Sequence, residues 1–217
     1  MLQAIQAQVM LQLQDDMNTK VNPDWLQARS PFLRAVVIEG AEAIEHHGWK
    51  WWKKQHCDLE QLQMELVDIW HFVLSERLLQ FAGKHSLAED SIFANIAETS
   101  LEFDGQSYVF TELDLLEKLE LLIGLAAAKR TSIGLFSALL LDCKMDWQSL
   151  YQQYVSKNVL NFFRQDNGYK QGTYRKVWDG REDNEHLVEL MTQLDATAAT
   201  FQQDLYHALQ QRYGRSK

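Results

Sequence analysis

Residues 39–72 read EGAEAIEHHGWKWWKKQHCDLEQLQMELVDIWHF, and their pattern sets the architecture of the chain. Acidic residues stand three positions apart twice, as Glu39 with Glu42 and as Glu65 with Asp68, among apolar neighbours. Residues three apart on a helix lie on one face. The stretch therefore predicts two helices that each point two carboxylates to one side.

The signals at the ends of these helices define a short connection between them. Ser30 as N-cap and Pro31 as first residue predict the start of the first helix, and Gly48 predicts its end. Asp58 predicts the start of the second helix, with Gln61 three residues later. Because the connection is short, we expect the helices to pack antiparallel and to bring the four acids together.

The rest of the chain also favours helices, since it contains few breakers and only two prolines. Residues 101–110 could be extended and are expected to form an irregular connection, and residues 168–183 are expected to form a loop. The expected fold is an all-α helical bundle in a single domain, residues 1–217, with the metal site between antiparallel helices. The further helices are expected over residues 1–20, 86–100, 111–130 (with Asp114 in the first turn), 131–143, 146–167 and 183–212 (capped by Asp183).

Composition and charge exclude several classes of protein. A chain of 217 residues with 46% hydrophobic and 24% charged residues is typical of a globular protein. The net charge of −9 argues against a nucleic-acid polymer as partner, which would need a basic face. No stretch is long and apolar enough to cross a bilayer, and the start lacks the basic region of a signal peptide. Cys57 and Cys143 fit buried thiols of a reducing compartment. We therefore expect a cytoplasmic protein with no membrane partner.

The four acids predict a site for a hard metal ion. Carboxylates crowded near a core repel one another and lose hydration unless a cation neutralises them. Oxygen ligands favour Mg²⁺ or Mn²⁺ over zinc. Two alternatives remain: each pair could be a solvent-facing stripe, or the acids could belong to a di-iron site. A di-iron bundle needs Glu-x-x-His on two helices, and only Asp68 with His71 approximates that spacing.

Two further segments indicate a nucleotide. Trp49, Trp51 and Trp52 lie in a basic turn just after the first acid pair, where they could pack in the core or stack on a flat base. Residues 164–183 combine an excess of Lys and Arg with three glycines, and no Walker A motif ends the segment. Together the segments predict a site for a base, a sugar and a metal-bound polyphosphate.

Three segments of the sequence resemble a known family. Residues 39–54 (EGAEAIEHHGWKWWKK), 65–72 (ELVDIWHF) and 157–184 (KNVLNFFRQDNGYKQGTYRKVWDGREDN) look like the dimeric, all-α dUTPases, relatives of the MazG-type NTP pyrophosphatases. The resemblance covers roughly residues 1–80 and 146–187, while residues 84–145, a less matched helical subregion, match no motif of the family.

The resemblance implies an activity and a cofactor. The expected reaction is hydrolysis of dUTP, and also of dUDP, to dUMP by water attack on the metal-bound polyphosphate. Glu39, Glu42, Glu65 and Asp68 are implied to bind two or more Mg²⁺ ions, with Mn²⁺ as a substitute. Glu39 is the acid expected to orient the attacking water. A homodimer is also implied, although the apolar segment 131–143 could equally be buried within one chain.

The resemblance further implies residues that contact the substrate. Gln14 and Asn18 match contacts to the uracil edge, and His71 matches a position beside the sugar. Trp51 and Phe72 match the aromatics that flank the base, although the spacing of HHG before WKWW leaves the choice among the three tryptophans open.

The sugar and the phosphates have their own expected contacts. Tyr154 and Asn161 match positions near the deoxyribose. The phosphate-side motifs contain Lys157, Arg164, Lys170, Lys176 and Asn184. Two other functions stay open beside this one: a MazG-like pyrophosphatase of broader specificity, and a nucleotide-binding helical protein without activity.

Overall fold

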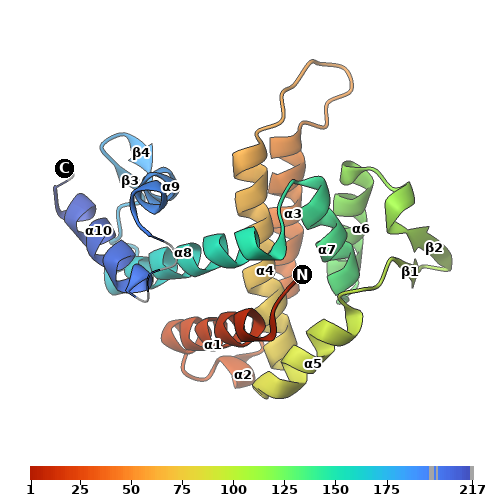
Figure 1. Cartoon of the computed structure of the whole chain (residues 1–217), viewed down its shortest axis with the longest axis horizontal. Helices are drawn as coiled ribbons and strands as arrows, with labels where there is room; N and C mark the ends of the chain where they lie inside the picture. Colours follow the sequence, from red (N-terminus) through yellow and green to blue (C-terminus); the bar gives the residue numbers. More distant parts are fainter. Residues whose placement is uncertain (196–197, 199, 216–217) are drawn as a thin grey trace.

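The centre of the molecule is a pair of antiparallel helices, α3 (Phe32–His47) and α4 (Leu59–Gln80), which lie side by side (Figure 1). The structure is a computed structural model that describes residues 1–195, 198 and 200–215. Side chains on almost every face of α4 are buried between Leu62 and Leu78, so this helix is the core element. The expected all-α fold is confirmed.

The connection between the two helices is closed at its base. The backbone N–H of Asp58 donates to the carbonyl oxygen of His46 at 2.8 Å, and the Asp58 side chain caps α4 by accepting from the N–H of Gln61. Gly48 ends α3 with a φ of +89°, a conformation that favours glycine. The N-cap of α3 is Pro31, one residue after the expected Ser30, because the helix begins at Phe32.

Helices from both halves of the chain surround this pair. α1 (Ala4–Val21) and α8 (Trp147–Asp166) pack against α4 and against each other. α6 (Leu115–Ala127) packs against α3, and α5 (His85–Asn95) contacts α1 and α7 (Ile133–Asp142). The α3–α4 pair is therefore held between two groups of helices, which lie on opposite sides in Figure 1.

Residues 101–110 form a hairpin and not the expected irregular connection. β1 (Ser100–Phe103) pairs antiparallel with β2 (Gln106–Val109) across a two-residue turn. Both turn residues, Asp104 and Gly105, have positive φ, which an Asp-Gly pair adopts readily. The Asp-Gly pair was the sequence signal for this hairpin.

Two helix starts also differ from expectation. A short 3₁₀ turn, η1 (Phe110–Glu112), follows the hairpin, so α6 does not open at Thr111. Asp114 is instead the N-cap of α6 and forms a capping box with Glu117, because its side chain accepts from that residue's N–H at 2.9 Å.

The C-terminal part contains two helices where one long helix was expected. α9 (Asp183–Gln193) has Glu182 as its N-cap and not Asp183, and α10 (Phe201–Arg215) packs against α8. Two short strands, β3 (Val177–Trp178) and β4 (Arg181–Glu182), precede α9. The single turn α2 (Trp25–Ala28) links α1 to α3 at the other end of the chain.

The strongly apolar segment 131–143 is explained largely by packing within the chain. Ile133, Leu135, Phe136 and Leu139 of α7 are buried, whereas Leu141 is 69% exposed. Among the described helices, none combines the length and the apolar character needed to cross a membrane.

Gly134 allows α7 to pack closely against Glu98, in the segment just before β1. A Cβ atom at Gly134 would lie 2.4 Å from the carbonyl oxygen of Glu98, so we expect Gly134→Ala to push α7 outward and to lower the free energy of unfolding by about 1–3 kcal/mol. Gly124→Ala in α6 is the matched control. Its Cβ would lie 3.5 Å from Phe103, an ordinary contact, so its stability should be unchanged or higher by about 0.5–1 kcal/mol. Urea denaturation measures both variants, and equal stabilities would contradict the close approach.

Candidate active site

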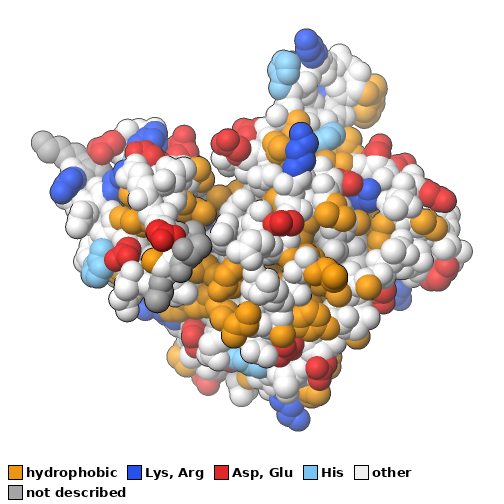
Figure 2. Space-filling model, in the orientation of Figure 1, with side chains coloured by type: hydrophobic (Ala, Val, Ile, Leu, Met, Phe, Trp, Pro, Cys, Tyr) orange, Lys and Arg blue, Asp and Glu red, His pale blue; other side chains and the backbone are white. Residues whose placement is uncertain are grey.

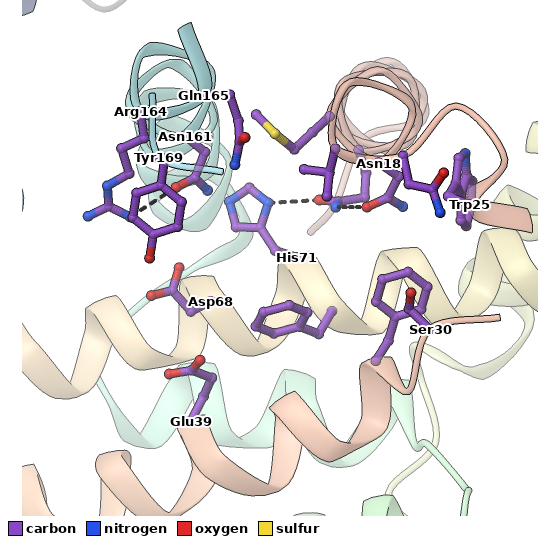
Figure 3. A pocket seen from close by; sticks show the side chains of 16 residues that line it. Asn18, Trp25, Ser30, Glu39, Asp68, His71, Asn161, Arg164, Gln165 and Tyr169 are labelled. Atoms are coloured by element: carbon purple, nitrogen blue, oxygen red, sulfur yellow. Dashed lines mark hydrogen bonds between the residues drawn. The ribbon is translucent and has the colours of Figure 1, made fainter. Parts of the chain in front are cut away.

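Three carboxylates meet where α3 and α4 pack. One oxygen from each of Glu39, Glu42 and Glu65 lies within 4.8 Å of the others, a spacing at which one metal ion can be held. Asp68, one turn further along α4, is bound instead by the Lys157 ammonium at 2.9 Å. Figure 3 shows the carboxylates of Glu39 and Asp68 at the same end of a pocket. The two acid pairs therefore converge, with Asp68 beside the group of three.

Crowding and burial change the acidity of this cluster. The pKa of Glu39 is raised to about 7 by burial and by the negative charges of Asp68 and Glu42. Burial and the charges of Asp68 and Glu39 raise the pKa of Glu65 to about 8, although Lys157 acts in the opposite direction. Lys157 therefore neutralises the acidic cluster only in part, and a divalent cation would supply further positive charge.

Glu39 and Asp68 line one end of a pocket of about 420 Å³ between α1, α3, α4 and α8 (Figure 3), whereas Glu42 and Glu65 do not line it. Asn18 and Trp25 lie at the other end, and His71 lies between. Six of the residues expected to bind substrate line this pocket, namely Gln14, Asn18, His71, Phe72, Asn161 and Arg164. The pocket is thus large enough for a nucleotide and has the acids at only one end.

Polar side chains on the pocket wall are bonded to one another. His71 bonds Gln14 through Nδ1 at 2.7 Å and stacks on the ring of Tyr154, 4.0 Å between centroids. Tyr154 is fully buried behind the wall and donates its hydroxyl proton toward Gln14 Oε1 at 2.8 Å. Burial lowers the pKa of His71 to about 3, so the imidazole is neutral at physiological pH.

The basic residues nearest the acids already have partners. Lys157 Nζ lies 3.1 Å from Asn184 Oδ1 in addition to its contact with Asp68. Arg164 forms two hydrogen bonds with the buried carboxylate of Asp183, at 2.7 and 2.8 Å, and a third with Asn161 Oδ1 at 3.1 Å. The Arg164 guanidinium holds the pKa of Asp183 below its usual value despite burial.

The two lysines of the basic loop lie further from the acids. Lys170 donates to the carbonyl oxygen of Val21, a pocket residue, at 2.7 Å, whereas Lys176 pairs with Glu182 at 3.0 Å on the surface. Tyr174 and Trp178 of the same loop pack around Phe163 of α8. Aromatic packing therefore holds part of this loop against the end of α8.

Trp51 lies outside the pocket. The side chain is 87% exposed and lies in the connection between α3 and α4, which projects beyond both helices (Figure 1). It packs edge-on against Trp52, with ring centroids 4.5 Å apart. The aromatics at the pocket are instead Trp25, Phe32, Phe72 and Tyr169. Only Phe72 was expected from the sequence, because the other three lie in segments whose approach to α4 depends on tertiary packing.

Comparison with known proteins agrees with this geometry. A family model described as dUTPase matches residues 6–169, well over half of the 217 residues. The matched range includes residues 84–145, where sequence motifs carry no resemblance, and it ends at Tyr169, before the rest of the basic loop. No curated protein matches the chain.

The raised pKa values predict how the metal-free protein responds to pH. Glu39 and Glu65 have pKa values of about 7 and 8 against an ordinary 4.5. At pH values between the ordinary and the raised pKa, the folded state therefore holds more protons than the unfolded chain. Stability should therefore fall as pH rises from about 6.5 to about 8.5. His71 acts in the opposite direction, but only below its ordinary pKa of 6.5.

Urea denaturation in EDTA at the two pH values measures this dependence. Glu65→Gln should flatten the slope, since its amide does not titrate. Glu60→Gln, which changes an exposed acid on the same helix, should leave the slope unchanged. A stability that rises over this pH range would contradict the crowded, partly buried cluster.

Proposed function

The chain belongs to the dUTPase family and is a dUTP nucleotidohydrolase, and from that premise we propose that it converts both dUTP and dUDP to dUMP with Mg²⁺ held by the acidic cluster. The observation that carries the proposal is the convergence of Glu39, Glu42 and Glu65, with oxygens within 4.8 Å, beside a pocket of nucleotide size that Glu39 itself lines. The phosphates would lie at the acidic end and the base at the end with Asn18 (Figure 3).

The donor set supports a hard divalent cation. The converging groups are carboxylates, which favour Mg²⁺, or Mn²⁺ as a substitute, over the metals that prefer nitrogen and sulfur. Glu39, Glu42 and Glu65 would hold a first ion, and Asp68 would join a second when Lys157 moves to the phosphates. When bound, the cation neutralises the acids, binds phosphate oxygens and makes water more acidic.

Each side chain near the acidic cluster would have a role that follows from its position. Glu39 lies at the boundary of the acidic cluster and the pocket, so we assign it the orientation of the attacking water. Lys157 and Arg164 lie beside the cluster and would stabilise the negative charge on the phosphoryl oxygens. Asn184, which bonds Lys157, would hold that ammonium in place, and Lys170 and Lys176 would act from the loop.

The nucleoside would lie against α1, α4 and α8. Gln14 and Asn18 would bond the base edge, and Phe72 would flank the ring. His71 and Asn161 would face the deoxyribose, with Tyr154 supporting His71 from behind. For Trp51 to flank the base, the connection between α3 and α4 would have to move or to reach the pocket of a second copy.

We also propose that the protein is a homodimer. Figure 2 shows hydrophobic side chains gathered around the N-terminus and α7. Here Met1 and Leu141 are exposed and line, with Phe93 and Ile96, a groove of about 320 Å³. An apolar surface of this kind is typical of an interface between proteins.

The nucleotide specificity tests the proposed reaction. With Mg²⁺, dUTP should be preferred over dTTP, dCTP and UTP, and dUDP should also give dUMP; release of nucleoside monophosphate measures each rate. One added methyl group separates dTTP from dUTP, which is worth roughly 10- to 100-fold in kcat/KM. Glu65→Gln should abolish turnover in EDTA-free buffer, whereas Glu60→Gln should retain it. Comparable kcat/KM for dUTP and dCTP would indicate a pyrophosphatase of broad specificity.

Light scattering tests the dimer. We expect a mass of about twice 25.3 kDa at micromolar concentration, and a shift toward the monomer in Leu141→Glu because the new charge would be buried in the interface. Val188→Glu, at an exposed apolar position of α9, is the control and should stay dimeric. A single-chain mass for the unmodified protein would contradict the proposal.

A further inference from the structure

A continuous chain of hydrogen bonds runs behind one wall of the pocket and joins α4, α1 and α8. It passes from Ser75 to Asn18, then to Gln14, and from Gln14 to both His71 and Tyr154. Ser75 is fully buried and does not line the pocket, whereas Asn18, Gln14 and His71 do. The groups that face the ligand are thus bonded to a residue that cannot touch it.

A backbone carbonyl at one end sets which atoms donate and which accept along this hydrogen-bond chain. Ser75 Oγ lies 3.0 Å from the carbonyl oxygen of His71, which can only accept, so the serine proton points there. Its oxygen then accepts from the Asn18 amide nitrogen at 3.1 Å. Ser75 Oγ is also 3.3 Å from Asn18 Oδ1, but one proton cannot serve both contacts, and the carbonyl of His71 is the nearer acceptor.

Each later step follows from the one before it. With its nitrogen on Ser75, Asn18 turns Oδ1 toward Gln14, whose nitrogen donates to it at 3.1 Å. Gln14 Oε1 then faces His71 Nδ1 at 2.7 Å, so this ring nitrogen must carry the proton. Among the described residues, His71 Nε2 has no hydrogen-bond partner although it is buried, and this nitrogen is left as a bare acceptor.

Tyr154 lies at the other end of this hydrogen-bond chain and also faces acceptor atoms. The Tyr154 hydroxyl lies 3.0 Å from the carbonyl oxygen of Met10 and 2.8 Å from Gln14 Oε1, and both are acceptors. When Tyr154 donates to the nearer of the two, the atom of Gln14 on that side is its oxygen. The single proton of Tyr154 has Gln14 Oε1 as the nearer acceptor, which fits the amide orientation set from Ser75 and the proton on His71 Nδ1.

We propose that Ser75 is a positioning residue that sets the direction of this hydrogen-bond chain, so that Asn18 and Gln14 present amide protons to the pocket and His71 keeps Nε2 unprotonated. Among the described residues, the side-chain amides of Asn18 and Gln14 each use one of their two protons, which leaves the second for a ligand. This inference rests on the proposed function and deepens it. Such a wall selects a base with carbonyl oxygens and rejects one that offers an amino group there.

The choice between uracil and cytosine tests the role of Ser75. Uracil offers a carbonyl oxygen where cytosine offers an amino group, so a flipped Asn18 would accept cytosine better. We expect Ser75→Ala to lower the ratio of kcat/KM for dUTP to that for dCTP by about 3- to 10-fold, the size of one hydrogen bond. A loss of stability alone would lower both rates together and leave the ratio unchanged.

Ser156→Ala is the matched control. Ser156 is also fully buried in a helix and bonds the carbonyl oxygen four residues earlier, Gln152 at 2.9 Å. Among the residues that the structure describes, it has no hydrogen bond to a member of this hydrogen-bond chain. Its ratio should equal that of the unmodified protein. Ser75→Cys, which keeps the size but weakens the donor, replaces Ser75→Ala if that variant does not fold. A ratio within twofold of the unmodified protein in a folded Ser75 variant would overturn the inference.

The tautomer of His71 gives a readout that needs no substrate. Nitrogen NMR of labelled imidazole, assigned by comparison with His71→Asn, should show the proton on Nδ1 in the unmodified protein and a mixture of tautomers in Ser75→Ala. Protonation of Nε2 in the unmodified protein, or one unchanged tautomer in Ser75→Ala, would overturn the inference. If the unmodified protein failed to cleave dUTP, the proposed function would fall, and this spectrum would still decide the role of Ser75.

Discussion

The packing of α3 against α4 forces negatively charged groups together, and the rest of the structure is arranged around that contact. Glu39 and Glu65 are partly buried beside Asp68, so their ionised forms are destabilised by lost hydration and by repulsion. The buried apolar side chains on the other faces of α4 hold the two helices together despite this repulsion. Lys157 from α8 offsets part of the charge, which makes α8 a necessary neighbour of the pair.

The basic groups of the site are paired with acids. Arg164 bonds the buried Asp183, and Lys157 bonds Asp68, within a chain whose net charge is −9. Binding a cation and a polyphosphate would let these side chains exchange a carboxylate for a phosphate oxygen. Such an exchange avoids leaving buried charges unpaired in either state, which would be costly.

The base end of the pocket follows a different principle. Its polar groups are neutral, and hydrogen bonds among Gln14, Asn18 and His71 hold them in one orientation. A buried network in which the groups are bonded to one another is rigid, so a base with the wrong donor pattern cannot easily turn the amides to suit itself. The charged end would therefore serve the phosphates and the rigid neutral end would serve recognition.

The sequence by itself determined the two central helices, most of the others and the two acid pairs, because helical periodicity and capping act over a few residues. The short connection between the central helices was enough to predict that the acid pairs converge. The Asp104-Gly105 turn was equally local and could have been recognised. Only the tertiary structure decided that Asp68 pairs with Lys157, that Trp51 stays outside the pocket, and that Ser75 lies behind Asn18. These relations join segments far apart in the chain, and they depend on how α1, α4 and α8 pack, which no local pattern encodes.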